Sequence, residues 1–523
     1  MRLRPFTILL VCLLALESVC IADLRLPAIF GEHMVVQRDK PLHVWGWGTA
    51  GEVVNVALAD HNFRTTVGAD GKWSLNLPPT AAGGPYTLSV KQGTDILSVP
   101  DVLVGEVWLC SGQSNMAMTV NRAQEFEAEQ AAATHPTIRM FKTGGKFAIE
   151  PQDDCTGTWT VCSPETVGGF SATAYFFARE LQQTLNVPVG LINSSVGGTP
   201  IEAWIPEEAQ RSAPQLREYV EAMDKARAEF DVEAAKAKYE VALEKWKETA
   251  KAARAEGKAP PRAPQDPVAQ LERKFSVGQL YNGMIAPVIP STIRGCLWYQ
   301  GEANSTEDKA GLYQYQLPVL VTEWRKINGG GELPFAWVQL PNFQGSGRNW
   351  PMVREAMMDA LYLPGTGMAV TMDVGETKDI HPKNKQAVGK RLALWAASEV
   401  YDINADKERT GGGSPAYVEH EIEANRVRVK FSHAGTAGLS YSPYEARLSV
   451  AAIAGEDGVW HPATITECDG DTITFMSAAV KEPVSLRYLW ANDPVPSIRN
   501  ADGIPASPFR TDDLEAVAPF DAN

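Results

Sequence analysis

The stretch from Gly105 to Met116 presents a serine directly after an apolar run and a glycine. Residues 107–110 are apolar and predict a buried strand, which stops at Ser111-Gly112. A helix can start near Met116, so the backbone N–H groups at this turn are free to face an anion. This geometry puts Ser114 at the rim of a sheet, where an acyl-transfer nucleophile has to lie. A serine that only caps the helix is the alternative, and this stretch alone favours neither.

A serine nucleophile also needs a general base and a carboxylate that orients the base. Of the eight histidines, His381 is the one that follows the last predicted strand of the central region. Asp379 stands two residues before it, a spacing that in a loop lets the carboxylate reach the imidazole. Glu302 is a second carboxylate that could support His381. The alternative for His381 is an ordinary histidine in a surface loop.

Two further turns offer hydrogen-bond donors for an oxyanion. Gly197 and Gly198 follow the predicted strand 189–193, and glycines let backbone N–H groups approach a ligand closely. Gln300 follows the predicted strand 295–299 and carries a side-chain amide. A simple turn and a solvated loop are the alternatives. Four such segments that all follow strands indicate a hydrolytic site.

The central region, residues 105–409, alternates apolar strand-like runs with helical stretches, which predicts a parallel sheet covered by helices on both faces. Functional residues are expected at the carboxyl ends of such strands. The expected strands include residues 107–110, 189–193, 295–299, 335–340 and 368–372, and the expected helices residues 175–184, 312–324 and 385–399. Residues 206–264 form a charged insertion whose apolar spacing predicts amphipathic helices lying on the surface.

Both flanks of the central region have β-type patterns. Residues 23–104 predict an amino-terminal β-sandwich, with a hairpin at Asp70-Gly71 between strands 63–67 and 73–77. Residues 410–523 predict a second, carboxyl-terminal β-domain. Residues 1–22 combine early arginines, an apolar run and small residues, which predicts a signal peptide and export to the periplasm or the extracellular space.

The composition bounds the possible partners. With 44% hydrophobic and 21% charged residues the chain is an ordinary globular protein of several domains. Its net charge of −15 argues against nucleic acid and anionic membrane surfaces as partners. No Cys/His cluster indicates a metal site, and neither a metal nor a cofactor is predicted. Cys155 and Cys162 are close enough in sequence to bridge a local loop.

Several of these segments resemble the bacterial sialate O-acetylesterase family of SGNH (GDSL-like) hydrolases. The resemblance covers nearly all of the chain after residue 22, from Met34–Arg38 at one end to residues 500–512 at the other. Its main motifs are GQSNM (112–116), SSVGGTPIEAW (194–204), LYNGMIAP (280–287), WYQGEAN (298–304), REAM (354–357) and DIHPKNKQAVGKRLAL (379–394).

This resemblance implies a three-layer α/β/α flavodoxin-like core with a parallel sheet, between two β-sandwich domains. It implies Ser114 as nucleophile and His381 as general base. The oxyanion hole would consist of the backbone N–H groups of Ser114 and Gly198 and the side chain of Gln300. For the orienting carboxylate the order of preference is Asp379, then Glu302, then Asp373.

The implied activity is that of a serine esterase that removes O-acetyl groups from a sugar or glycan through an acetyl-enzyme. The first expectation is a 9-O-acetyl sialate, with Trp204 and Trp350 stacking on the sugar and Arg354 meeting the sialate carboxylate. An acetylxylan or other polysaccharide deacetylase on the same fold is an alternative. A non-catalytic carbohydrate-binding surface protein is another, and a lipase or thioesterase a third. No membrane insertion is expected after removal of the signal peptide.

Overall fold

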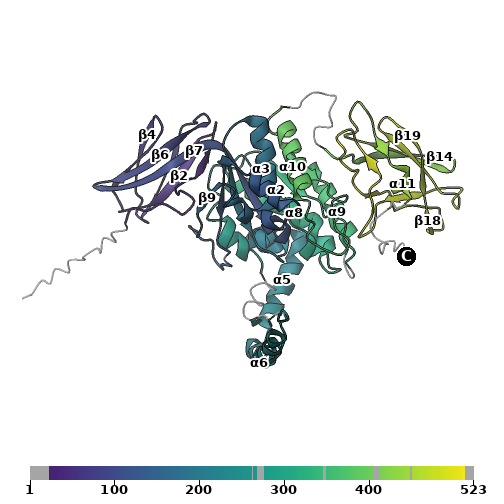
Figure 1. Ribbon diagram of the computed structural model, residues 1–523, viewed down its shortest axis with the longest axis horizontal. Helices are drawn as coiled ribbons and strands as arrows, with labels where there is room; N and C mark the ends of the chain where they lie inside the picture. Colours follow the sequence, from purple (N-terminus) through teal and green to yellow (C-terminus); the bar gives the residue numbers. More distant parts are fainter. Residues whose placement is uncertain are drawn as a thin grey trace, which may run out of the picture.

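The computed structural model describes residues 23–145, 147–261, 263–264, 266–267, 276–345, 349–403, 413–447 and 450–512. The predicted signal peptide and the predicted boundary at 409/410 lie outside these residues. Figure 1 shows an α/β core between two β-rich regions, with the amino-terminal strands on the left and the carboxyl-terminal strands on the right. Among the described helices, none is both long and apolar enough to cross a membrane.

The core is a mixed sheet in the order β13-β12-β11-β7-β10-β8-β9. All neighbours pair in parallel except β8 and β9, which are antiparallel at one edge. Parallel strands place their carboxyl ends at one edge of the sheet, where the predicted site residues follow them. The core strands are β7 (Asp95–Gly112), β8 (His135–Lys142), β9 (Trp159–Cys162), β10 (Val189–Ser195), β11 (Gly295–Tyr299), β12 (Phe335–Val338) and β13 (Thr366–Ala369).

Helices cover both faces of this sheet, because the core strands are apolar on both sides. On one face, α3 and α10 pack against each other and against Trp108 of β7. On the other face, Trp298 of β11 packs with Trp204 and with Trp324 of α8. The core helices include α1 (Ser114–Ala117), α2 (Phe126–Ala132), α3 (Ala172–Leu185), α8 (Tyr313–Ile327), α9 (Trp350–Asp359) and α10 (Lys385–Glu399). The predicted α/β fold with a parallel sheet is confirmed.

The amino-terminal region contains two facing sheets. One pairs β2 with β5, and the other contains β1, β3, β4 and β6 together with the first half of β7. Its strands are β1 (Val35–Gln37), β2 (Leu42–Trp47), β3 (Val53–Leu58), β4 (His61–Thr66), β5 (Lys72–Leu77) and β6 (Gly83–Gln92). The hairpin predicted at Asp70-Gly71 is wrong, because β4 pairs with β3 and β5 with β2, so this turn connects two sheets.

The strand β7 belongs to both regions. Its first half pairs with β1 and β6, and its second half with β10 and β11. The predicted boundary at 104/105 therefore falls within a continuous strand of 18 residues.

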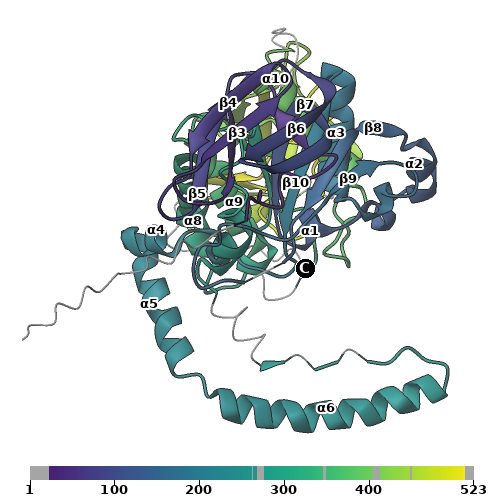
Figure 2. The ribbon, with the colours of Figure 1, turned by 90° about the vertical axis from the view of Figure 1, so that its left-hand side faces the viewer.

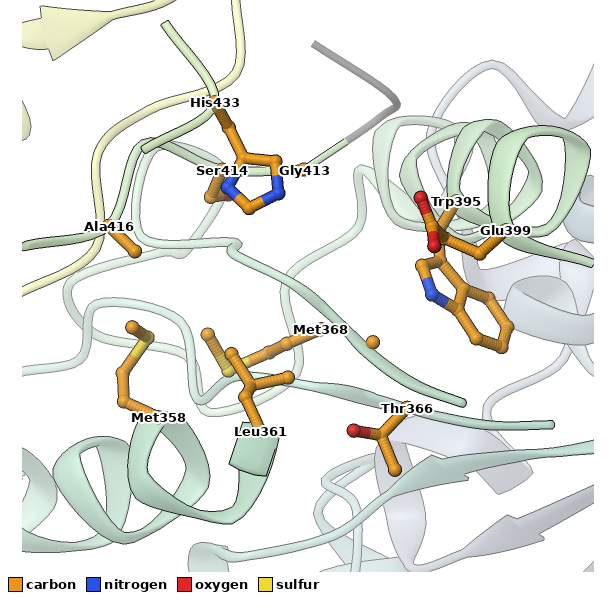
Figure 3. A pocket seen from close by; sticks show the side chains of 11 residues that line it. Met358, Leu361, Thr366, Met368, Trp395, Glu399, Gly413, Ser414, Ala416 and His433 are labelled. Atoms are coloured by element: carbon orange, nitrogen blue, oxygen red, sulfur yellow. The ribbon is translucent and has the colours of Figure 1, made fainter. Parts of the chain in front are cut away.

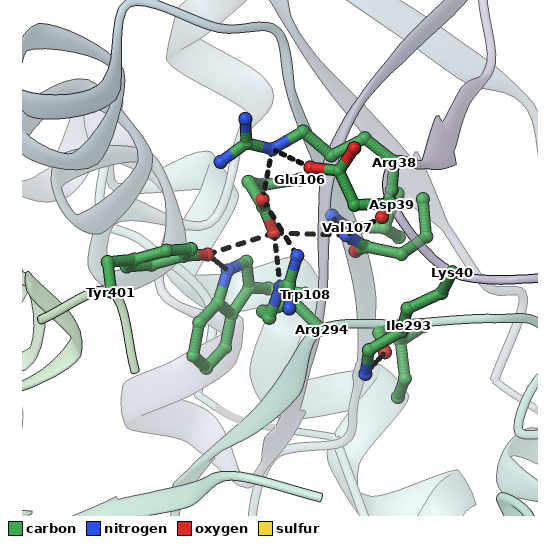
Figure 4. A network of polar contacts seen from close by, with 10 residues as sticks. Arg38, Asp39, Lys40, Glu106, Val107, Trp108, Ile293, Arg294 and Tyr401 are labelled. Carbon is green, nitrogen blue, oxygen red and sulfur yellow. Dashed lines mark hydrogen bonds and ion pairs between the residues drawn. The ribbon is translucent and has the colours of Figure 1, made fainter. Parts of the chain in front are cut away.

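The carboxylate of Glu106, midway along β7, is fully buried and joins three segments (Figure 4). It accepts hydrogen bonds from Arg38 Nε at 2.5 Å, Arg294 Nε at 2.7 Å and the Tyr401 hydroxyl at 3.0 Å. Burial alone would raise the pKa of Glu106, but the hydrogen bond and positive charge of Arg294 and the hydrogen bond from Arg38 outweigh it and lower the pKa. This network joins the amino-terminal sheet to the core at the strand ends opposite the predicted site.

The insertion forms the expected helices, α4 (Glu207–Ser212), α5 (Pro214–Ala228) and α6 (Val232–Ala255). Their placement differs from the prediction, because α5 and α6 project from the core instead of lying on its surface (Figure 2). In α6, Ala250 is the buried residue, and Val241 is 73% exposed. Trp246 donates a hydrogen bond to the carbonyl of Pro261, so the segment after α6 packs against this helix.

The carboxyl-terminal region is β-rich, as predicted. It includes a four-stranded sheet in the order β14-β15-β20-β19 and another in the order β18-β17-β21-β23. Its elements are β14 (Tyr417–Glu423), β15 (Arg426–Phe431), β16 (Ser440–Tyr441), α11 (Pro443–Ala446), β17 (Ala451–Ala454), β18 (Trp460–Pro462), β19 (Thr464–Asp469), β20 (Thr472–Met476), β21 (Ser485–Tyr488), β22 (Ile498–Arg499) and β23 (Phe509–Arg510). Cys155 and Cys162 are both free thiols, so the structure holds no bridge between them.

Candidate active site

Ser114 is the first residue of α1 and is separated from the end of β7 by Gln113 alone. Gly112 has φ +136°, and a Cβ there would lie 2.2 Å from the carbonyl oxygen of Tyr299, so only glycine lets β7 approach β11 at this turn. Gln113 occupies the helix N-cap position, not Ser114. The interpretation of Ser114 as a capping serine is therefore wrong, and its half-buried hydroxyl is available for another partner.

That partner is His381, in the loop between β13 and α10. The Nε2 atom of His381 lies 2.8 Å from Oγ of Ser114, a hydrogen-bond distance. The imidazole is 28% exposed, so solvent and small molecules can reach the pair. Two residues that are 267 positions apart in sequence are thus brought together at the carboxyl edge of the sheet. This arrangement can activate a serine hydroxyl by removing its proton.

The surroundings of His381 favour the neutral imidazole. Partial burial lowers its pKa below the ordinary 6.5, and the positive charges of Arg122 and Lys385 lower it further. The negative charge of Asp379 acts in the opposite direction but does not outweigh them. A neutral imidazole accepts a proton, which is the form that a general base needs.

We expect the acid limb of kcat/KM to have its inflection below pH 6.5, the ordinary imidazole value. The base works only when neutral, so activity falls as the pH drops through the pKa of His381. Hydrolysis of p-nitrophenyl acetate across the acid range measures this limb. In Asp379→Asn the inflection should move to still lower pH, because the charge that raises the pKa of His381 is gone. An inflection above 6.5 in the unaltered protein would contradict this description of the site.

The three candidate carboxylates have different positions. Asp379 is the nearest to the imidazole, with Oδ1 3.6 Å from Nδ1 of His381, and the same oxygen accepts the backbone N–H of His381 at 2.9 Å. Glu302 is buried and accepts a hydrogen bond from the side chain of Asn115. Asp373 is held by Arg391 at 2.6 Å and Arg499 at 2.9 Å. Asp379 is therefore the carboxylate that the structure brings to the imidazole.

The turn at Gly197 and Gly198 lies directly beside Ser114. A Cβ at Gly197 would be 3.3 Å from Cβ of Ser114, and Gly198 has φ +72° and is exposed. Among the described residues, no hydrogen-bond acceptor is found for the backbone N–H of Ser114 or of Gly198. These two donors can therefore meet an oxyanion at this turn.

Gln300 follows β11 as predicted, but its side chain does not have the predicted role. Its side chain is fully buried, and its amide nitrogen lies 2.7 Å from Oδ1 of Asn304 and 3.2 Å from both the Thr199 carbonyl and Oε1 of Gln113. Its carbonyl oxygen accepts the Tyr313 hydroxyl. An amide has two hydrogens, and these acceptors already take both. Gln300 therefore donates to the carbonyl of Thr199, the residue after Gly198, and has no free amide hydrogen for an oxyanion at Ser114.

The three predicted sugar-binding residues are fully buried. Trp204 donates to the Thr199 hydroxyl at 3.0 Å, and Trp350 donates to the Pro341 carbonyl at 2.6 Å. Arg354 donates to the backbone carbonyls of Leu340, Pro341, Ala491 and Asn492. None of these side chains has a surface for a sugar, which corrects the expectation that they bind substrate.

Three residues near the pair were not predicted from the sequence. Asn115 and Lys385 are fully buried and hydrogen-bonded to each other. Arg122 is exposed and close enough to affect the pKa of His381. A lysine directly after the predicted histidine loop, at the start of a helix, was the available signal for Lys385. An arginine eight positions after the serine was the signal for Arg122.

A cavity of 220 Å³ lies elsewhere, between the core and the carboxyl-terminal region (Figure 3). Its lining includes Trp395, Glu399 and His433 but none of the predicted site residues. Within the described ranges, no group of three or more His, Cys, Asp or Glu side chains is placed to hold a metal ion.

Comparison with known proteins places this site in a family. The family model of carbohydrate esterases described as sialic acid-specific acetylesterase matches residues 104–240 and 268–398. The sialate O-acetylesterase of Rattus norvegicus is 29% identical over 517 residues, covering 90% of each chain. The Homo sapiens sialate O-acetylesterase is 28% identical over 533 residues, covering 93% of this chain and 92% of its own.

A solved structure supports the same assignment. The crystal structure of a carbohydrate acetylesterase from Xanthomonas citri has a TM-score of 0.77 and 33% sequence identity. It covers 94% of this chain and 100% of its own. The matched family region contains Ser114, Gly198, Gln300 and His381. The chain therefore belongs to the sialic acid-specific acetylesterase family of carbohydrate esterases.

Proposed function

We propose that this carbohydrate esterase cleaves acetyl esters of sugars with Ser114 as nucleophile and His381 as general base. The 2.8 Å contact between Oγ of Ser114 and Nε2 of His381 carries the proposal. It is the arrangement in which a base can take the serine proton as the oxygen attacks a carbonyl. The partial exposure of both side chains supports access by a substrate.

In the proposed reaction His381 takes the Ser114 proton while Oγ attacks the acetyl carbonyl. The tetrahedral oxyanion accepts hydrogen bonds from the N–H groups of Ser114 and Gly198. His381 then gives its proton to the departing sugar oxygen, which leaves an acetyl-serine. Water, activated by the same imidazole, attacks this ester and releases acetate. Asp379 stabilises the imidazolium that forms in each half of the reaction.

We further propose that the sugar is an O-acetylated sialic acid, which carries a carboxylate. The sialate O-acetylesterases of Rattus norvegicus and Homo sapiens, to which the chain is similar, support this substrate. Arg122 is the cation that fits the role first assigned to Arg354, because it is exposed and no described carboxylate forms an ion pair with it. It lies on the segment next to the His381 loop, where the Gln124 N–H donates to the Lys383 carbonyl at 3.0 Å.

Arg122→Gln tests this assignment. For 9-O-acetyl sialic acid we expect KM to rise about 10-fold, because a charge-assisted hydrogen bond to the carboxylate is lost. For the neutral ester p-nitrophenyl acetate, kcat/KM measured above the His381 titration should stay within about twofold. Lys383→Gln, which removes another exposed cation beside the same loop, is the matched control. Equal effects on both esters would contradict the role of Arg122.

Acetate release from acetylated xylan, measured in parallel, decides the substrate class. A higher kcat/KM for acetylated xylan than for 9-O-acetyl sialic acid would favour the polysaccharide alternative. Sugar binding without any acetate release would favour the non-catalytic alternative.

A further inference from the structure

We propose that Asn115 and Lys385 are positioning residues, which hold the serine and the histidine at reacting distance through one buried amide. The inference rests on the proposed roles of Ser114 and His381. It concerns how the two segments that carry them are held together, beyond the 2.8 Å contact itself.

Asn115 connects the two segments directly. It follows Ser114 in α1, and its side chain is fully buried. Its Nδ2 atom donates to the carbonyl of Ile380, the residue before His381, at 3.0 Å. A single carboxamide thus joins the neighbour of the nucleophile to the neighbour of the base.

Two charged side chains determine which way this amide points. The Lys385 Nζ atom donates to Oδ1 of Asn115 at 2.6 Å, and the Glu302 carboxylate accepts from Nδ2. An ammonium group only donates and a carboxylate only accepts, so the reverse orientation of the amide would lose both hydrogen bonds. The contact with Ile380 then follows, because Nδ2 is turned toward the His381 loop.

Lys385 is an unfavourable residue at this position on stability grounds. It is fully buried at the first position of α10, where the helix dipole disfavours a cation. Burial lowers its pKa to about 7, although the charges of Glu302, Glu376 and Asp379 act to raise it; Arg122 acts with the burial. Its other neighbour is the Tyr299 ring, 4.9 Å from Nζ. The hydrogen bond to Asn115 and the attraction of the Glu302 carboxylate are the interactions that offset the desolvation of this buried amine.

Lys385→Met and Asn115→Asp test the proposal. In both we expect kcat for p-nitrophenyl acetate to fall about 10- to 100-fold with KM within about threefold, because small misplacements of reacting groups affect the chemical step. Thermal unfolding, measured in parallel, checks that both variants are folded. Lys383→Met, which removes a 57% exposed lysine two positions earlier, is the matched control and should keep wild-type kcat.

The pH profile separates positioning from a merely structural role. The charge of Lys385 lowers the pKa of His381, so in Lys385→Met the acid limb of kcat/KM should move to higher pH. Wild-type kcat and an unmoved limb would overturn the proposal, and if Ser114→Ala is inactive in the same assay the proposed function still stands. If Lys385→Met does not fold, Asn115→Asp decides: a folded variant with wild-type kcat overturns the proposal.

Discussion

Ser114→Ala is expected to lower kcat for acetyl ester hydrolysis by about 10⁴-fold or more, because the bond-forming oxygen is removed. Among the described residues, no other hydroxyl lies within hydrogen-bonding distance of the His381 imidazole. The measurement is acetate release from 9-O-acetyl sialic acid, with p-nitrophenyl acetate as the neutral comparison. Ser114→Ala that keeps most of its activity would contradict the assignment of the nucleophile.

The loss should come from chemistry and not from unfolding. Ser114 is half-buried, and its hydroxyl contacts the imidazole. Removing an oxygen there creates no large cavity, so we expect the Tm of Ser114→Ala to stay within a few degrees of wild type. KM for the same substrate should change little, because the rest of the site is unaltered.

His381→Asn is expected to lower kcat by a similar factor, about 10⁴-fold or more, since the serine then has no base. The double variant Ser114→Ala/His381→Asn should be no slower than Ser114→Ala alone, because the two residues act as one unit. Activities of the two single variants and the double variant, measured in one assay, check this. Additive losses would mean that His381 acts independently of Ser114.

His135→Asn is the matched control for the loss of a histidine from the core. His135 lies at the start of β8, and the Tyr175 ring is its aromatic neighbour at 6.4 Å. We expect kcat within about twofold of wild type for this variant. A large loss of kcat in His135→Asn would show that the assay responds to destabilisation of the core and not to loss of the catalytic base.

The sequence predicted well those features that depend on local pattern. Residues 295–299 and 385–399 coincide with β11 and α10, and the strand predicted over 107–110 lies within β7, which continues to Gly112. Because parallel strands place their carboxyl ends at one edge, the order of turns along the chain already brought Ser114 and His381 to the same edge of the sheet. Their proximity follows from that topology, and the side-chain contacts of Asn115 then join the two segments.

What the sequence did not predict depends on contacts between distant segments. Arg354 looked available for a substrate, but the carbonyls that surround it include those of residues 491 and 492, far along the chain. The pairing of β5 with β2 replaced a local hairpin for the same reason. Gln300 has the predicted residue type at the predicted strand end, yet neighbouring acceptors take its amide hydrogens.

Burial also decided which charged residues belong to the site. Lys385 is fully buried although lysines are usually exposed. The spacing of apolar residues in α10 does not distinguish it from an exposed lysine such as Lys390. Spacing favours Asp379 over Glu302 as the carboxylate for His381, and in the structure Asp379 Oδ1 lies 3.6 Å from the imidazole. The carboxylate of Glu302 instead accepts a hydrogen bond from the side-chain amide of Asn115, the residue after Ser114.

The most direct test is to label the protein with a fluorophosphonate and to locate the label by peptide mass spectrometry. The proposed mechanism predicts one phosphonylated residue, Ser114, with labelling abolished in Ser114→Ala and strongly slowed in His381→Asn. It also predicts that labelled protein releases no acetate from 9-O-acetyl sialic acid. Label on a different residue, or full esterase activity in protein labelled at Ser114, would contradict the central claim.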